Sequence, residues 1–167
     1  ARAEGDPGKG AALRWHLDRH PLDPDEALVV LDADNRIPPN LLNRFADELD
    51  SGRQALQAYL DVTNPDASLL TTAGAVSYWA SSRMIQQART RLGWPADLGG
   101  TGMCLTADAL ESAGGFGDSL TEDTDLGVRL ALAGVPVRWL HDLNIGDEKP
   151  ATLRATVGQR ARWAAGK

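Results

Sequence analysis

Two carboxylates, Asp32 and Asp34, directly follow the short apolar run at residues 27–31. The length and valine content of this run predict a strand buried on both faces. Ligands of open α/β sheets bind beyond the carboxyl ends of the strands. Two acids two positions apart point to the same side of an extended chain and can hold Mg²⁺ or Mn²⁺, with substrate phosphates completing the coordination. For the pair alone, a solvated turn is at least as good an account, because Asp is frequent in turns.

A second acidic group, Glu122, Asp123 and Asp125, lies in the segment 121–125. The segment is predicted to start a helix, where the helix dipole stabilises carboxylates, and for this group alone that is the favoured account. In the functional interpretation one carboxylate is a general base, a role that typically contributes about 10²–10⁴ in rate.

A third group, Gln159, Arg162 and Trp163, falls on one face of a predicted C-terminal helix. The opposite face carries the apolar residues of this helix: Leu153, Val157, Ala161 and Ala164. The core side is therefore assigned without Trp163, whose indole suits stacking on a sugar ring, while the forked donors of Arg162 suit a diphosphate. The alternative is an amphipathic helix with Trp163 packed on a neighbouring element.

Weaker signals come from single residues and one glycine-rich loop. Lys9 opens the first predicted helix and could touch a phosphate there, although a solvated lysine is the favoured account. The loop 99–102 lets backbone approach a substrate but lacks the spacing of a dinucleotide-binding motif or a P-loop. His141 could reach a metal, but an ordinary histidine is favoured, and Cys104 is expected to be a buried structural thiol.

Composition sets the class of protein. The chain has 167 residues, a net charge of −6 and a pI of about 5.0, so we expect one domain and no nucleic-acid partner. A phosphorylated substrate would need a metal or a local arginine cluster. No stretch approaches 18 apolar residues, and the first residues do not form a signal peptide. We expect residues 1–167 to be one partial domain, truncated at both ends.

Strand and helix signals alternate along the chain, which predicts an α/β layered fold. Helices are expected at 8–20, from Pro38 to Gly52, at 67–92, after a Thr106 cap, at 121–133 and at 150–165. Strands are expected at 27–31, 54–62, 101–105 and 135–139. In 54–62, Leu56, Ala58, Leu60 and Val62 face one way, and Gln57, Tyr59 and Asp61 the other. The helix at 67–92 could lie at a membrane surface or equally well pack on the sheet.

Taken in order, these motifs resemble family-2 glycosyltransferases of the processive, membrane-embedded type, such as cellulose synthase and hyaluronan synthase. The matching segments cover almost the whole chain: 9–13, 29–34, 57–59, 100–103, 121–123 and 159–163. The resemblance implies a GT-A fold, a Rossmann-like mixed sheet flanked by helices, here without the N-terminal strands that hold the nucleoside in family members.

The resemblance also implies roles for individual residues. Asp32 and Asp34 would bind Mg²⁺ or Mn²⁺, and Asp123 would be the base for an inverting transfer from a nucleoside-diphosphate sugar, with UDP-sugar favoured. The remaining implied contacts divide between the donor diphosphate (Lys9, Gln159 and Arg162) and the acceptor (Thr101, Gly102, Glu122 and Trp163). The acceptor would be a saccharide or a lipid. Membrane segments outside this chain would hold the domain at the cytoplasmic face of the cell membrane.

Two other functions fit parts of the pattern. A haloacid-dehalogenase-like phosphatase also presents its nucleophile and acid as Asp32 and Asp34 would be presented. It needs a downstream lysine and a further acidic pair, which Asp123 and Asp125 could supply. It would leave the face formed by Gln159, Arg162 and Trp163 unexplained. A non-catalytic domain that binds carbohydrate or metal is the third interpretation.

Overall fold

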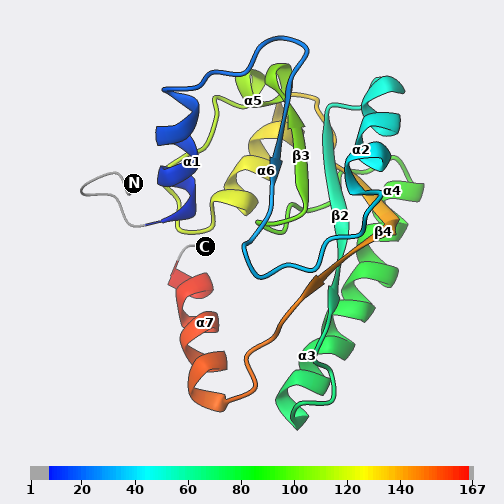
Figure 1. The fold of residues 1–167 in the computed structure, drawn as a ribbon, viewed down its shortest axis with the longest axis vertical. Coiled ribbons are helices and arrows are strands. Elements are labelled where there is room, and N and C mark those ends of the chain that lie inside the picture. The colour runs from blue at the N-terminus through cyan, green and yellow to red at the C-terminus, as the bar shows by residue number, and fades with distance from the viewer. Residues whose placement is uncertain (1–7, 166–167) are drawn as a thin grey trace.

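A four-stranded mixed sheet forms the centre of the computed structural model, which describes residues 8–165 apart from the side chains of Arg162 and Trp163 (Figure 1). The strands are β1 (Ala27–Val30), β2 (Ala55–Val62), β3 (Met103–Thr106) and β4 (Arg138–Asp147), in the spatial order β1-β3-β2-β4. Strand β3 is antiparallel to both β1 and β2, whereas β2 and β4 are parallel. The predicted mixed α/β architecture is confirmed.

Helices cover both faces of the sheet. They are α1 (Lys9–Leu17), α2 (Leu41–Asp50), α3 (Leu69–Ala80), the π-helical segment η1 (Ser81–Gln86), α4 (Gln87–Arg91), α5 (Ala107–Ser112), α6 (Glu122–Leu132) and α7 (Leu153–Ala165). One apolar core joins the sheet to α1, α5 and α6, and a second joins the other face to α2. Thr106 caps α5 as expected, because its Oγ1 accepts a hydrogen bond from the Ala109 amide at 3.1 Å.

The prediction that residues 27–31 are buried on both faces is confirmed only in part, because Leu28 and Val30 pack with one core and Val29 and Leu31 against the other. Within the described residues β1 lies at an edge of the sheet, and only Val30 is fully buried. Strand β2 lies inside the sheet instead. Its predicted alternation is confirmed as a division between the two cores, with Leu56 in one and Tyr59 in the other, and Gln57 is buried as well.

The last strand is longer than predicted and begins later. Val135 and Val137 precede β4, which continues to Asp147. Its register with β2 shifts between Ala58, which pairs with Leu140, and Tyr59, which pairs with Asn144. This irregularity breaks the two-residue period, so sequence patterning alone did not predict the second half of the strand.

The predicted helix at 67–92 is confirmed in extent but not in regularity, because α3 and α4 are joined through the π-helical η1. It packs against the sheet through Trp79, whose Nε1 donates a hydrogen bond to Asp61 Oδ1 at 2.8 Å. Across residues 8–165 no helix combines the length and hydrophobicity that crossing a membrane requires.

Candidate active site

The turn after β1 carries the first two predicted site residues. The Asn35 amide donates to the Asp32 carbonyl at 3.1 Å, which closes the turn. The Asp32 amide donates hydrogen bonds to Thr101 Oγ1 at 2.9 Å and to Asn35 Oδ1 at 3.3 Å. Thr101 Oγ1 donates in turn to Asn35 Oδ1. Asp32 and Asp34 are exposed, so their carboxylates face solvent, while hydrogen bonds to Thr101 hold the turn in place.

Lys9, at the start of α1, reaches across to this turn. Its Nζ lies 2.5 Å from Asp32 Oδ1 and 2.6 Å from the carbonyl oxygen of Gly100. The two side chains of the ion pair are 30% and 46% exposed. Such a pair contributes only about 0–1 kcal/mol to stability. Lys9 therefore places an ammonium beside the carboxylates without being a strong part of the fold.

A buried glutamine of β2 fixes the glycine-rich loop. Gln57 Oε1 accepts from the Gly99 amide at 2.8 Å. Its Nε2 donates at 2.9 Å to the carbonyls of Thr101 and Ala58. Because the side chain is 1% exposed, water does not replace these bonds. Gln57 thus fixes the backbone of the loop in which Gly100 contacts Lys9 and Thr101 contacts Asp32.

The same loop lies against the start of α6. At Gly100, whose φ is +76°, a Cβ atom would lie 3.1 Å from Asp123 Oδ2. Only glycine takes this backbone conformation easily and leaves room for the carboxylate. The other oxygen of Asp123, Oδ1, accepts from the Thr124 amide at 2.7 Å. The loop and the Asp123 carboxylate are therefore in direct contact.

Glu122 is the buried partner of Asp123. It is 8% exposed, and a Cβ atom added at Gly10 of α1 would lie only 2.8 Å from its Cβ. Burial raises the pKa of Glu122, and the charges of Asp123 and Asp32 raise it further while Lys9 lowers it. The Glu122 carboxyl therefore senses the charges of this site but is shielded from solvent.

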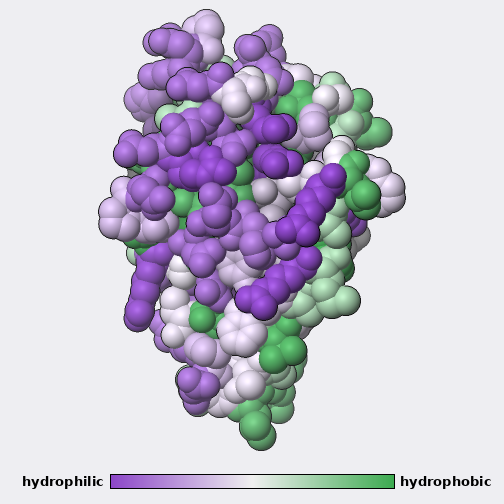
Figure 2. Space-filling view, turned by 90° about the vertical axis from the view of Figure 1, so that its right-hand side faces the viewer, coloured by the Kyte–Doolittle hydropathy of each residue, from purple (hydrophilic) through white to green (hydrophobic). Residues whose placement is uncertain are grey.

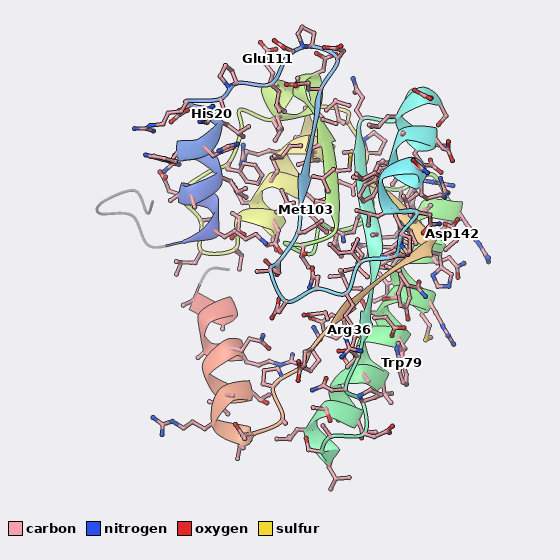
Figure 3. All side chains as sticks on the ribbon, in the orientation of Figure 1. His20, Arg36, Trp79, Met103, Glu111 and Asp142 are labelled. Carbon is pink, nitrogen blue, oxygen red and sulfur yellow. The ribbon has the colours of Figure 1, made fainter. Side chains whose placement is uncertain are left out.

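The fold thus gathers Lys9, Asp32, the loop 99–102, Glu122 and Asp123 from four separate parts of the chain. They meet beyond the carboxyl end of β1, which is where sequence analysis placed Asp32 and Asp34. Figure 3 labels His20 and Glu111 at the opposite, upper end of the molecule. The candidate metal ligand His141 is elsewhere as well, in β4, where its Nδ1 accepts from Trp139 Nε1 at 3.4 Å.

The third predicted group is not tested by these contacts. Gln159 is half-buried on α7, which lies below α1 in Figure 1. The side chains of Arg162 and Trp163 lie outside the described residues. Their roles at the diphosphate and at the acceptor stay predictions.

Asp32 and Asp34 suit a hard divalent cation by their chemistry, because Mg²⁺ and Mn²⁺ prefer oxygen ligands. Within the described part of the chain, no cluster of three or more His, Cys, Asp or Glu side chains could hold a metal. These two carboxylates fit the open site of a substrate-bound metal, in which phosphates and water supply the other ligands.

Sequence reasoning assigned no role to Asn35 or Gln57. Asn35 directly follows the two aspartates, and its Nδ2 is buried without a hydrogen-bond partner. Gln57 is a polar residue inside an otherwise apolar part of a strand, which is the one signal that could have indicated a buried hydrogen-bonding role.

Comparison with known proteins places these features in a family. Residues 27–167 match the model of the glycosyl transferase family group 2. The chain is similar to glucomannan 4-beta-mannosyltransferase 2 of Arabidopsis thaliana, with 32% identity over 161 residues that cover 95% of this chain and 30% of the relative. It is also similar to beta-monoglucosyldiacylglycerol synthase of Trichormus variabilis, with 31% identity over 99% of this chain and 35% of the relative.

The chain spans about a third of the length of these two relatives. Among solved structures, the fold resembles the mannosyltransferase PcManGT from Pyrobaculum calidifontis, determined in complex with GDP-Man and Mn²⁺. The TM-score is 0.70 at 21% identity, covering 98% of this chain and 42% of that one. The match contradicts the phosphatase alternative, since the family model spans most of the chain: this protein belongs to the glycosyl transferase family group 2.

Proposed function

We propose that the protein transfers a hexose, with inversion, from a nucleoside-diphosphate sugar to a hydroxyl of a saccharide or lipid. The observation that carries the proposal is the convergence of Lys9, Asp32 and Asp123 on the Gly100 loop. It brings together a cation (Lys9), a possible metal ligand (Asp32) and a possible general base (Asp123) at one edge of the sheet. That combination suits a reaction in which a diphosphate leaves and a hydroxyl loses its proton.

The donor diphosphate needs positive charge, because the chain as a whole is at −6. Asp32 and Asp34 would hold Mg²⁺ or Mn²⁺, which when bound neutralises the charge that develops on the leaving diphosphate. The Mn²⁺ named for the similar mannosyltransferase structure supports this choice of metal. Lys9 supplies a second positive charge beside Asp32, and Gln159 and Arg162 complete the proposed diphosphate contacts.

Asp123 would accept the proton of the attacking hydroxyl. The acceptor oxygen forms a bond to the anomeric carbon as the bond from that carbon to the diphosphate oxygen breaks on the opposite face. The proton passes to the Asp123 carboxylate, and the electron pair leaves with the nucleoside diphosphate. Asp123 lies in the first turn of α6, beside the glycine-rich loop that would border the acceptor.

The acceptor would border Thr101, Gly102, Glu122 and Trp163. Names of the relatives include both a polysaccharide and a diacylglycerol product, which supports a sugar or lipid hydroxyl. The sequence resemblance favours a uridine diphosphate donor, and the similar solved structure holds GDP-Man, so both nucleotides belong in the assay. We also propose that segments outside this chain hold the whole protein at the cytoplasmic face of the membrane.

The test is Asp123→Asn in the intact protein, assayed with UDP- and GDP-hexoses and Mn²⁺. Transfer should fall by about 10²–10⁴, the usual contribution of a general base, while calorimetric donor affinity changes less than about twofold. The matched control is Asp125→Asn, since Asp125 lies in the same turn but pairs with Arg129 at 2.7 Å. Near-normal transfer by Asp123→Asn would remove Asp123 from the base role.

The metal assignment has its own test. Asp34→Asn should weaken Mn²⁺-dependent donor binding, and an unchanged metal titration would contradict the assignment. Donor binding without product in the wild-type protein, with every acceptor class tried, would instead support a non-catalytic binding domain.

A further inference from the structure

One face of the long helix formed by α3 and η1 is apolar and open to solvent. Its members, which we call the outward row, follow steps of four, three, four and four residues: Leu69, Ala73, Val76, Ala80 and Met84. Leu69 is 90% exposed, Val76 54% and Met84 75%. This spacing places them along one side of a helix.

The opposite side of the same helix is already committed to the protein. Thr71, Ala75, Ser82 and Gln86 are buried there. Gln86 also exchanges two hydrogen bonds with Asp97, at 2.9 and 3.0 Å. Because these contacts fix the rotation of the helix, the outward row cannot turn inward without breaking them.

The π-helical segment keeps the row straight. In a regular α-helix, at about 100° per residue, a side chain at position 84 would lie some 60° away from that of Leu69. A π-turn contains more residues, so the step from Ala80 to Met84 across η1 completes nearly one turn. Met84 therefore returns to the line of Val76 and Leu69.

Charge distinguishes this helix from the rest of the chain. Residues 67–96 contain three arginines and no Asp or Glu, although the chain carries a net charge of −6. Arg89 pairs with Asp97 at 2.7 Å, and Arg83 hydrogen-bonds the Tyr59 hydroxyl. Arg91 is exposed beside the row. An anionic surface that the protein repels elsewhere can therefore approach along this helix.

Figure 2 shows the same division on the surface, with hydrophobic residues gathered along the lower and right-hand margin and hydrophilic residues over the upper left. An exposed apolar row, on a helix that carries no carboxylate and continues to the exposed Arg91, matches the two demands of a bilayer interface, which takes apolar side chains among its acyl chains and cations among its headgroups. A protein partner needs no such combination of an aliphatic row with a segment free of acids.

We propose that the outward row of α3 and η1 docks on a lipid bilayer containing anionic headgroups. The contact lies outside the candidate active site and does not depend on the proposed transfer reaction. It places the hydrogen-bonded residues Gln86 and Asp97, and with them the loop that continues to Gly99, directly above the lipid surface.

The direct test is a polarity-sensitive fluorophore attached to Met84→Cys in the 167-residue chain, which lacks the outside segments proposed to anchor the whole protein. Labelling is selective because Cys104 is 1% exposed and burial raises its pKa to about 12. The matched control is Leu132→Cys on α6, since Leu132 is another exposed aliphatic residue, at 82%. With phosphatidylglycerol–phosphatidylcholine vesicles, the label at position 84 should shift to the blue and gain intensity, and the label at 132 should not.

Two further arms measure what drives the contact. Val76→Ser with Met84→Ser should weaken vesicle binding by about tenfold or more through lost apolar burial, whereas Leu132→Ser should leave it unchanged. Arg91→Gln should weaken binding to anionic vesicles by about fivefold and leave binding to pure phosphatidylcholine unchanged. Circular dichroism checks that each variant is folded.

Equal responses at positions 84 and 132, or no response at either, would overturn the proposal. So would a label at position 84 that is already shielded in the lipid-free 167-residue chain, because another segment of the chain would then cover the row. Loss of sugar transfer with normal vesicle binding would count against the proposed function alone.

Discussion

Replacement of Gln57 by leucine removes the side-chain hydrogen bonds that hold the loop 99–102 to β2. Leucine is close in size to glutamine, so packing is largely kept and the lost hydrogen bonds dominate. The Gly99 amide and the Thr101 carbonyl lose their partner, and the Thr101 carbonyl bond is buried. Each buried group left unsatisfied costs about 1–3 kcal/mol, so we expect a loss of about 3 kcal/mol in the free energy of unfolding.

For a chain of this size, that loss lowers Tm by roughly 6–12 °C. Sugar transfer should fall further, since a displacement of about 1 Å in positioning groups can cost 10²-fold in rate. The control is Gln54→Leu, because Gln54 is a half-buried glutamine directly before the same strand. Thermal unfolding by circular dichroism and initial transfer rates give the two readouts.

The reasoning fails if Gln57→Leu melts within about 2 °C of the wild-type protein, well below the expected shift for this chain length. Hydrogen exchange at the Gly99 amide separates the remaining cases. Faster exchange with unchanged transfer would show that the loop is released but that its position does not matter for catalysis.

Three further predictions concern single positions. Gly100→Ala should reduce transfer far more than Gly93→Ala, because both glycines have φ near +75° but only the first would bring a Cβ to 3.1 Å from Asp123; equal losses would point to backbone strain alone. Burial raises the pKa of Glu122, so ionisation of this carboxyl destabilises the folded state as pH rises above the pKa of the unfolded state. Glu122→Gln should therefore raise Tm at pH 7. That gain should disappear below about pH 4, where the carboxyl is protonated in both states; a gain independent of pH would contradict the assignment. Burial raises the pKa of Cys104 to about 12, so Ellman's reagent at pH 8 should modify it only on unfolding, and rapid native reaction would show that the core opens.

The meeting of Asp32 with Asp123 follows from local sequence signals. Each acid stands at a recognisable boundary, one after an apolar run and one at a helix start. Boundaries of this kind collect at strand ends in α/β folds, so their convergence was predictable. The partners that fix them were not, because Gln57 and Thr101 bond backbone groups up to 69 positions apart in the chain, and no local pattern records such a pairing.

The parts of the fold that sequence reasoning missed depend on strand order and helix irregularity. A valine-rich run such as that before Asp32 is equally suited to an inner strand or an edge strand, and only the pairing with β3 decides. The register shift after Ala58 interrupts the alternation in the second half of β4. The segment η1 differs from an α-helix in its hydrogen-bond pattern and in its residues per turn, not in the types of its residues. These features follow from tertiary contacts, which a residue's own type does not encode.

Gly102, just before β3, links β1 and β2, the strands on either side of β3, at the site. Its amide donates to the Val30 carbonyl at 2.8 Å, and its carbonyl accepts from the Ala58 amide at 2.8 Å. One peptide segment therefore bridges the carboxyl end of β1 and the middle of β2. Opening this part of the loop therefore requires breaking hydrogen bonds to both strands, so we expect its exchange protection to follow that of the sheet. Under the proposed function, adaptation to different acceptors would then come from side chains around the loop and not from movement of its backbone.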